Sequence, residues 1–231
     1  MKIIFNADDY GLTKGITDGI IKSHKEGVVR STTLMMNGQA VNYAIALAKE
    51  NPTLAVGIHL VLTHGKPIAQ DVPNLVNQSG HFKFAKSAIS INEYELSDIE
   101  TEFRAQIEQF LATGLKLDHI DSHHHVHGWP QLKTLMIKLA KDYQVPVRYV
   151  PSLKDQTDIL FTDNIWLKFY KDELELDLFS QLKRIKAESV EVMVHPGIVD
   201  QALIDISSYT HDREKELAML CTMEIPDWVN L

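Results

Sequence analysis

Short runs of apolar, β-branched residues alternate along this chain with longer amphipathic segments, and this alternation constrains the fold more than any other feature. The short runs have the length of strands, and the longer segments carry apolar residues at helical spacing. Strands that alternate with helices predict a parallel sheet with helical crossovers. Two architectures fit this pattern, an open doubly wound sheet and a (β/α) barrel with fewer or distorted units.

The bounds of the predicted elements follow from these runs and from the residues that end them. Gly27 ends the first predicted helix and Asn51-Pro52 ends the second. Strands are predicted at Lys2–Asn6, Val28–Met36, Leu54–Leu60, Leu117–Asp121, Val145–Val150 and Val190–His195. Helices are predicted at Thr13–Glu26, Ala40–Glu50, Glu93–Thr113, Pro130–Tyr143, 166–187 and Asp212–Leu220. Residues 63–92 and 151–165 are predicted to be irregular, and because no linker divides the chain, residues 1–231 are expected to form a single α/β domain.

Polar side chains gather at or just beyond the carboxyl ends of the predicted strands. The members of this group are Asp8, Asp9, His59, Asp121, His123, Arg148 and His195. Barrel enzymes place their chemistry at the carboxyl ends of successive strands, whereas an open sheet gathers it mainly at one switch point. The sequence therefore favours a single-domain distorted (β/α) barrel.

Composition excludes several classes of function. The chain has 23 Lys and Arg against 31 Asp and Glu, a formal net charge of −8, so nucleic acid is not an expected partner. No apolar run approaches the roughly 20 residues that cross a membrane, and the first residues turn acidic too soon for a signal peptide. The single cysteine, Cys221, excludes an internal disulfide framework. A cytoplasmic protein is expected.

The strongest local signal is the segment His119–His127, which holds five of the 11 histidines of the chain. Imidazole is the commonest neutral metal ligand, and a nearby carboxylate such as Asp121 orients such a ring through its other nitrogen. If the strand ends at Asp121, His123 and His125 leave it on one side. His127 could reach the same site if the chain curls into the next helix.

Two adjacent carboxylates, Asp8 and Asp9, follow the first predicted strand. Such groups repel each other and are costly to bury, which a bound cation would offset. A turn with Thr13 as helix cap is the structural alternative, but it accounts for only one acid. A lone strand histidine such as His59 is more often a core residue, yet the other clusters favour its being a ligand. His195 repeats the strand-end position.

This combination of residues predicts a metal-dependent hydrolase. Two histidines and one carboxylate leave coordination positions open for water and substrate, and the second carboxylate and a further histidine remain for acid–base work. The sequence has no G-x-S-x-G, P-loop or G-x-G-x-x-G motif, so a serine nucleophile or nucleotide binding has no support.

Several motifs resemble those of the YdjC-like carbohydrate deacetylases, and the matches span nearly the whole chain. The motifs are Asn6–Gly11, Ser31–Thr33, Asn37-Gly38, Gly57–Leu60, His119–His127 and Val194–Gly197. The resemblance implies a distorted barrel related to polysaccharide deacetylases. It also implies metal-dependent removal of acetyl groups from small N-acetylated saccharides such as the chito-oligosaccharide diacetylchitobiose. Homodimers are common in this family.

The resemblance also implies roles for individual residues. One divalent cation per chain, usually magnesium, would be held by Asp9, His59 and His123. Asp8 would be the general base. His195 matches, by its strand-end motif, the family's histidine on the side of the general acid. Two imidazole ligands suit Zn²⁺, Mn²⁺ or Co²⁺ better than Mg²⁺ on chemical softness.

Other residues are candidates for a supporting role. Asp121, His125 and His127 could orient the ligands. Arg148 could orient Asp8 or bind a sugar hydroxyl, or it could form a surface ion pair. Tyr10, Trp129 and Trp166 could stack on a sugar ring, although such residues more often pack in the core. The alternatives to a deacetylase are another metal-dependent amidase or phosphoesterase and a non-catalytic sugar-binding relative.

Overall fold

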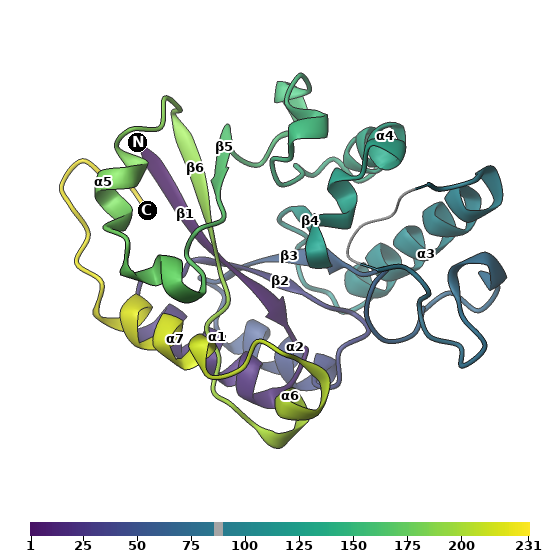
Figure 1. Ribbon diagram of the computed structural model, residues 1–231, viewed down its shortest axis with the longest axis horizontal. Coiled ribbons are helices and arrows are strands. Elements are labelled where there is room, and N and C mark those ends of the chain that lie inside the picture. The colour runs from purple at the N-terminus through teal and green to yellow at the C-terminus, as the bar shows by residue number, and fades with distance from the viewer. Residues whose placement is uncertain (86–89) are drawn as a thin grey trace.

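A parallel six-stranded sheet forms the centre of the computed structural model, which describes residues 1–85 and 90–231 (Figure 1). The strand order is β4-β3-β2-β1-β6-β5, and every neighbouring pair is parallel. The strands are β1 (Lys2–Tyr10), β2 (Ser31–Leu34), β3 (Ala55–Leu60), β4 (Ile120–Ser122), β5 (Asn164–Trp166) and β6 (Ser189–Val194). The central strands are almost entirely buried, as expected for a parallel sheet covered on both faces.

The sheet curls toward a barrel through isolated pairings beyond β4. Ile120 forms a parallel bridge with Val147, and Val147 forms another with Leu160. The chain then runs directly from Leu160 into β5, which lies at the opposite edge of the sheet. Residues 160–166 therefore connect the two edges, and the predicted distorted (β/α) barrel is confirmed.

Seven α-helices occur in the described part of the chain. They are α1 (Lys14–Glu26), α2 (Val41–Glu50), α3 (Glu93–Leu111), α4 (Lys133–Tyr143), α5 (Leu178–Leu182), α6 (Gln201–Ile206) and α7 (Asp212–Thr222). Short 3₁₀ turns lie at Pro73–Leu75, His123–Gly128, Pro130–Leu132, Pro151–Leu153, Thr157–Ile159 and Lys171–Glu175. The Thr13 hydroxyl accepts a hydrogen bond from the Ile16 amide and so caps α1, as its position in the sequence suggests. No helix of the described residues is both long and apolar enough to span a bilayer.

The second half of the chain departs from the predicted elements. The predicted strand Val145–Val150 is wrong, because that segment contributes only the bridge at Val147. The end of the segment 151–165, predicted to be irregular, forms the start of β5. The predicted long helix over 166–187 is also wrong, and α6 was not predicted. Lys171 has a left-handed φ of 50°, and Asp177 caps a new helix, so these two residues divide the segment.

Residues 63–92, predicted to be irregular, contain the turn Pro73–Leu75 and one bridge between Val76 and Phe82. Positions 86–89 of this prediction lie outside the described residues.

The two ends of the chain meet at the start of β1. Asn230 pairs with this end of the strand, and the Ile3 amide donates to the Asn230 carbonyl over 2.8 Å. The two chain ends accordingly lie close together (Figure 1).

Candidate metal centre

The two adjacent carboxylates lie at an irregularity near the end of β1. The strand is longer than predicted and includes Asp8 and Asp9, and its pairing with β2 shifts register between Ala7 and Tyr10. Asp9 has a left-handed φ of 69°. Successive side chains of a regular strand point to opposite faces, so this bulge allows both carboxylates to line the same cavity. An aspartate in a left-handed conformation is typical of a strained functional site.

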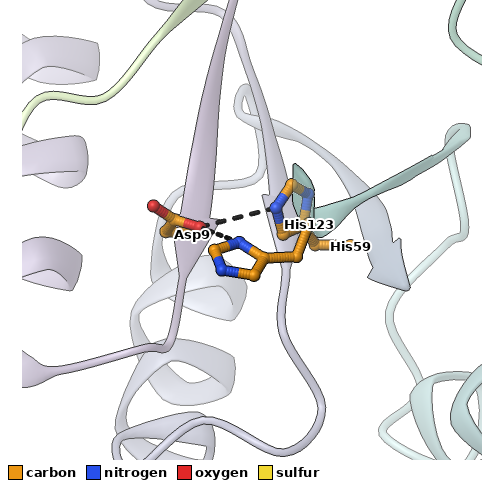
Figure 2. A group of neighbouring side chains, drawn as sticks. All are labelled: Asp9, His59 and His123. Carbon is orange, nitrogen blue, oxygen red and sulfur yellow. Dashed lines mark hydrogen bonds and ion pairs between the residues drawn. The ribbon is translucent and has the colours of Figure 1, made fainter. Parts of the chain in front are cut away.

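Asp9, His59 and His123 converge from three different segments of the sheet (Figure 2). Asp9 Oδ1 lies 3.4 Å from His59 Nε2 and 3.1 Å from His123 Nδ1. His59 lies at the end of β3, and His123 directly follows β4. One ligand atom from each residue lies within 4.8 Å of the others. One carboxylate and two imidazoles are a donor set that fits a catalytic divalent ion, because three protein ligands leave further positions open toward the cavity.

The orientation of His59 is fixed from behind by Asp121. His59 Nδ1 lies 2.7 Å from Asp121 Oδ1, and the Thr33 hydroxyl donates to Asp121 Oδ2 over 3.0 Å. A proton on Nδ1 leaves Nε2 to face Asp9, which is the arrangement of a metal-binding histidine backed by a carboxylate. Burial lowers the pKa of His59, but Asp121 and Asp9 raise it more, to about 10. The ring therefore carries positive charge unless a cation takes the place of its proton.

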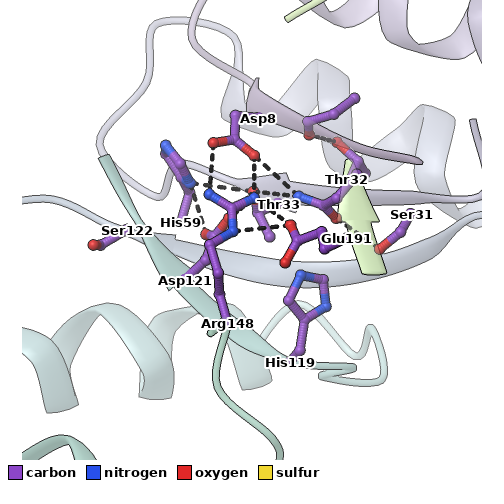
Figure 3. A network of polar contacts seen from close by, with 12 residues as sticks. Asp8, Ser31, Thr32, Thr33, His59, His119, Asp121, Ser122, Arg148 and Glu191 are labelled. Atoms are coloured by element: carbon purple, nitrogen blue, oxygen red, sulfur yellow. Dashed lines mark hydrogen bonds and ion pairs between the residues drawn. The ribbon is translucent and has the colours of Figure 1, made fainter. Parts of the chain in front are cut away.

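Asp8 forms a buried pair with Arg148 (Figure 3). The guanidinium donates from Nη1 to Asp8 Oδ2 over 2.8 Å and from Nη2 to Asp8 Oδ1 over 2.5 Å. It also contacts Asp121 and Glu191, and its side chain is 0% exposed. The alternative that Arg148 forms a surface ion pair is thus wrong. Burial alone would raise the pKa of Asp8, but Arg148 more than offsets it, so Asp8 is an ionised carboxylate held in one orientation.

The opposite wall of the site contains His195 and residues of α7. Glu216 accepts hydrogen bonds from the His195 amide and from the Tyr209 hydroxyl. Burial raises the pKa of Glu216 to about 8. Burial also lowers the pKa of His195 to about 4, so its imidazole is neutral near neutral pH. Its Nδ1 is buried, 3.9 Å from Glu216 Oε1, which leaves Nε2 as the nitrogen that can face the cavity.

Arg213 is a second buried guanidinium at the centre and was not predicted from the sequence. Its Nη2 donates to Asp9 Oδ2 over 2.6 Å, and its Nε donates to the Tyr209 carbonyl over 2.9 Å. A signal for Arg213 and Glu216 does exist in the sequence. Both lie on the same helical stripe as Leu217 and Leu220, and all four are buried. Charged residues on the apolar face of a helix are candidates for a buried site.

A cavity of about 360 Å³ opens above these groups. It is lined by Asp8, Asp9, Leu12, His59, His64, His123, His124, His125, Leu167, Tyr170, Met193, His195, Ile206, Ser207, Ser208, Tyr209 and Arg213. His64 was not predicted. Its carbonyl accepts a hydrogen bond from Asn37, and the neighbouring amides of Ile68 and Ala69 donate to the buried Glu102 of α3, which fixes this segment.

Several predicted sugar contacts lie elsewhere. The predicted role of Tyr10 is wrong, because Tyr10 is fully buried and donates its hydroxyl to the Ala44 carbonyl in α2. The predicted role of Trp129 is wrong as well, because its buried ring packs against Phe84. Trp166 belongs to β5 and does not line the cavity. His125 lines the cavity, and His127 is buried behind it with its Nδ1 against the Ser122 hydroxyl.

The charge balance of the centre favours a cation. Among the described residues, five carboxyl groups are buried here with two guanidinium groups, and the carboxyls are Asp8, Asp9, Asp121, Glu191 and Glu216. Burial raises the pKa of Glu191 and of Glu216, whereas an arginine helps to hold the pKa of Asp8 and of Asp9 below the ordinary value. Asp8 and Asp9 are therefore adjacent buried carboxylates, and a divalent ion held by Asp9 would offset the cost of burying their charge.

Comparison with known proteins gives matches over nearly the whole chain. Residues 2–231 match the family described as YdjC-like protein. A protein of Oceanobacillus iheyensis named carbohydrate deacetylase is 55% identical over 229 residues, which cover 99% of this chain and 100% of that protein. Another of that name from Brevibacillus brevis is 44% identical over 237 residues, which cover 100% of this chain and 95% of its own. The crystal structure of a suggested cellobiose-phosphate cleavage protein from Enterococcus faecalis V583 superposes with a TM-score of 0.85 at 35% identity, over 96% of this chain and 91% of that one.

Proposed function

Because this chain belongs to the family of YdjC-like proteins, we propose that it is a metal-dependent carbohydrate deacetylase. Its substrate would be a small N-acetylated saccharide, from which it releases acetate. The name of the relatives that are 55% and 44% identical supports the deacetylase activity. The observation that carries the proposal is the convergence of Asp9, His59 and His123 beside the separately held carboxylate of Asp8.

Asp9, His59 and His123 are the residues that would hold the divalent ion. A bound ion of this kind lowers the pKa of water and polarises the acetamide carbonyl. Two imidazoles and one carboxylate suit Zn²⁺, Mn²⁺ or Co²⁺ at least as well as Mg²⁺. The family resemblance favours Mg²⁺, so the identity of the ion belongs among the variables of the test.

The side chains around this triad divide the acid–base work. Asp8 is ionised and fixed by Arg148, so its carboxylate can accept the proton of the attacking water. His195 lies across the cavity and would pass on to the departing sugar nitrogen the proton that Asp8 takes from the attacking water. Its pKa of about 4 makes the imidazolium a strong acid once it forms, which suits transfer to an amine.

The charges of the cavity favour an uncharged acetamide over a phosphate ester. Among the described residues that line it, Arg213 is the one permanent cation, and it is paired with Asp9. Lysine is absent from that described lining. A phosphoryl group would therefore meet Asp8 and Asp9 without a free cationic partner of the protein. The volume of about 360 Å³ suits a small sugar, and we propose a chito-oligosaccharide such as diacetylchitobiose.

The test is acetate release from diacetylchitobiose by metal-stripped protein that is re-supplied with Mg²⁺, Zn²⁺, Mn²⁺ or Co²⁺ in turn. An aryl phosphate and a phosphorylated disaccharide are assayed in parallel, with Asp8→Asn as the control. Metal-dependent acetate release that disappears in the control supports the proposal. Phosphate release without acetate release would assign a phosphoesterase. Saccharide binding without turnover in any metal would indicate a sugar-binding protein.

A further inference from the structure

The two oxygens of Asp9 have different partners. Oδ1 faces the imidazoles of His59 and His123 at 3.4 and 3.1 Å. Oδ2 points the other way and accepts a hydrogen bond from Arg213 Nη2 over 2.6 Å. One oxygen therefore faces the candidate metal centre, and the other is hydrogen-bonded to Arg213 of α7.

Arg213 is held so that it cannot follow Asp9 freely. Its side chain is only 4% exposed, and its Nε donates to the Tyr209 carbonyl. The backbone carbonyl of Arg213 also accepts a hydrogen bond from the amide of Gly197, just beyond His195. Arg213 thus has a fixed place between Asp9 and the segment that carries His195.

We propose that Arg213 is a positioning residue that reserves Oδ2 of Asp9, so that Asp9 offers a metal ion one oxygen instead of two. The inference rests on the proposed metal centre but not on the identity of the substrate. An aspartate that is free to rotate can bind with both oxygens and fill a position needed for water or the acetyl oxygen. The guanidinium also draws negative charge from Asp9, which leaves a bound ion more electrophilic.

This role differs from that of a purely structural ion pair in the direction of its effects. Loss of a structural contact would loosen the site and weaken metal binding. Loss of a guanidinium that reserves Oδ2 removes a nearby positive charge and frees this oxygen as a second ligand atom, so metal binding does not weaken while turnover falls. The two roles can therefore be separated by measuring both quantities.

The experiment compares Co²⁺ binding and turnover in the full chain and in Arg213→Gln, Arg213→Lys and Lys215→Gln. Lys215 is exposed on the same helix and serves as the matched control. Co²⁺ reports its coordination number in its visible absorption, which is intense for four ligands and weak for six. We expect Arg213→Gln to bind Co²⁺ at least as tightly as the parent with weaker absorption per ion, and to lose turnover by about 10- to 100-fold. Arg213→Lys, which keeps a cation, should recover part of both signals.

The outcomes separate this inference from the proposed function. An unchanged Co²⁺ spectrum in folded Arg213→Gln, or weakened Co²⁺ binding in both Arg213 variants, overturns the inference. If the parent chain itself binds no Co²⁺, Zn²⁺ or Mn²⁺, the proposed metal centre fails instead. Circular dichroism of each variant establishes that the comparison is made on folded protein.

Discussion

Asp8 and Asp9 are neighbours in sequence, but their surroundings give them different properties. Asp8 accepts two hydrogen bonds from Arg148, one on each oxygen, which leaves it ionised and held in one orientation. Asp9 divides its oxygens between two imidazoles and Arg213. Burial raises the pKa of both carboxyls, and in both an arginine is the largest of the effects that outweigh it. Two identical side chains can therefore serve as base and ligand.

Substituting each aspartate by asparagine should separate these roles. Asp8→Asn keeps the shape of the side chain but cannot accept a proton, so we expect turnover to fall by roughly 10²- to 10⁴-fold with metal content unchanged. Asp9→Asn should lose the metal as well. Elemental analysis after dialysis, with acetate release measured on the same samples, provides both numbers. Equal loss of metal in the two variants would contradict the assignment.

Glu216 should make the stability of the metal-free protein depend on pH. Its pKa rises from 4.5 in the unfolded chain to about 8 in the folded one. The folded state therefore favours the protonated form, so the contribution is fully present below pH 4.5 and is lost as the pH rises through about 8. Glu216→Gln cannot titrate, and its free energy of unfolding should fall less than that of the parent over this range. Urea unfolding at about pH 5 and about pH 8 measures the difference, and parallel curves would refute it.

Residue types single out the carboxylate pair, His59 and the histidine cluster, because polar residues are rare at the ends of buried strands. The choice of Asp9, His59 and His123 among these residues comes from the family resemblance. Tyr10 and Trp129 were misplaced, because an aromatic residue near a motif does not reveal which way its ring points. Arg148 was predicted as a candidate to orient Asp8, and the structure shows this contact. Arg213 was missed, because it meets Asp9 from 204 positions away in the sequence.

At the scale of elements, β3 and β4 approach closely because β3 contains Gly57. A Cβ at this position would lie 2.6 Å from the His119 carbonyl oxygen and 2.7 Å from its ring. His119 precedes β4, which carries Asp121 and leads to His123. The absence of a side chain at Gly57 thus lets the strands that carry His59 and His123 pair in register.

Gly57→Ala should therefore push β4 away from β3. We expect the free energy of unfolding to fall by about 1–3 kcal/mol, the range for overpacking a core. Metal affinity should fall too, because His59 and His123 lie on the two displaced segments. Gly80→Ala is the comparison, since nothing lies within 4 Å of its added Cβ and only its left-handed φ of 74° is strained. If Gly57→Ala matches Gly80→Ala in both measurements, the close approach is not what requires glycine.

The sequence predicts an element well where its apolar residues keep a single spacing from end to end, as in α1 and α3. It fails over 166–187, where apolar residues at helical spacing belong to separate short segments. The left-handed φ of Lys171 is not suggested by its residue type, whereas the cap at Asp177, which accepts hydrogen bonds from Ser180, is a local signal that the predicted long helix overlooked. The end of β1 was missed for a related reason, because carboxylates are unfavourable in a strand unless a site such as this one requires them.

Across the whole molecule, Arg148 connects strands from both halves of the sheet. It contacts Asp8 in β1, Asp121 in β4 and Glu191 in β6 (Figure 3). The sequence between these strands is long, but the contacts meet at one guanidinium. Its removal would leave three buried carboxyl groups without their shared cation.

Arg148→Gln should accordingly lower the free energy of unfolding by about 3–5 kcal/mol. Arg104→Gln is the matched control, because Arg104 also bridges two carboxylates, Glu100 and Asp142, but is partly exposed in α3. Its loss should amount to about 0–1 kcal/mol. Denaturant unfolding of both variants gives the comparison. Similar losses would mean that Arg148 acts as an ordinary surface pair does.

The single bridges that close the barrel have a consequence for heat inactivation. Val147 forms one bridge on each side, to Ile120 and to Leu160, whereas β1 and β6 pair along six residues. Local opening at this seam should therefore require less free energy than dismantling the sheet. Arg148 directly follows Val147, so each opening would withdraw the guanidinium from Asp8 while β1, β3 and the ligands they carry stay folded. Warming would then inactivate the protein reversibly at temperatures where its secondary structure is still intact.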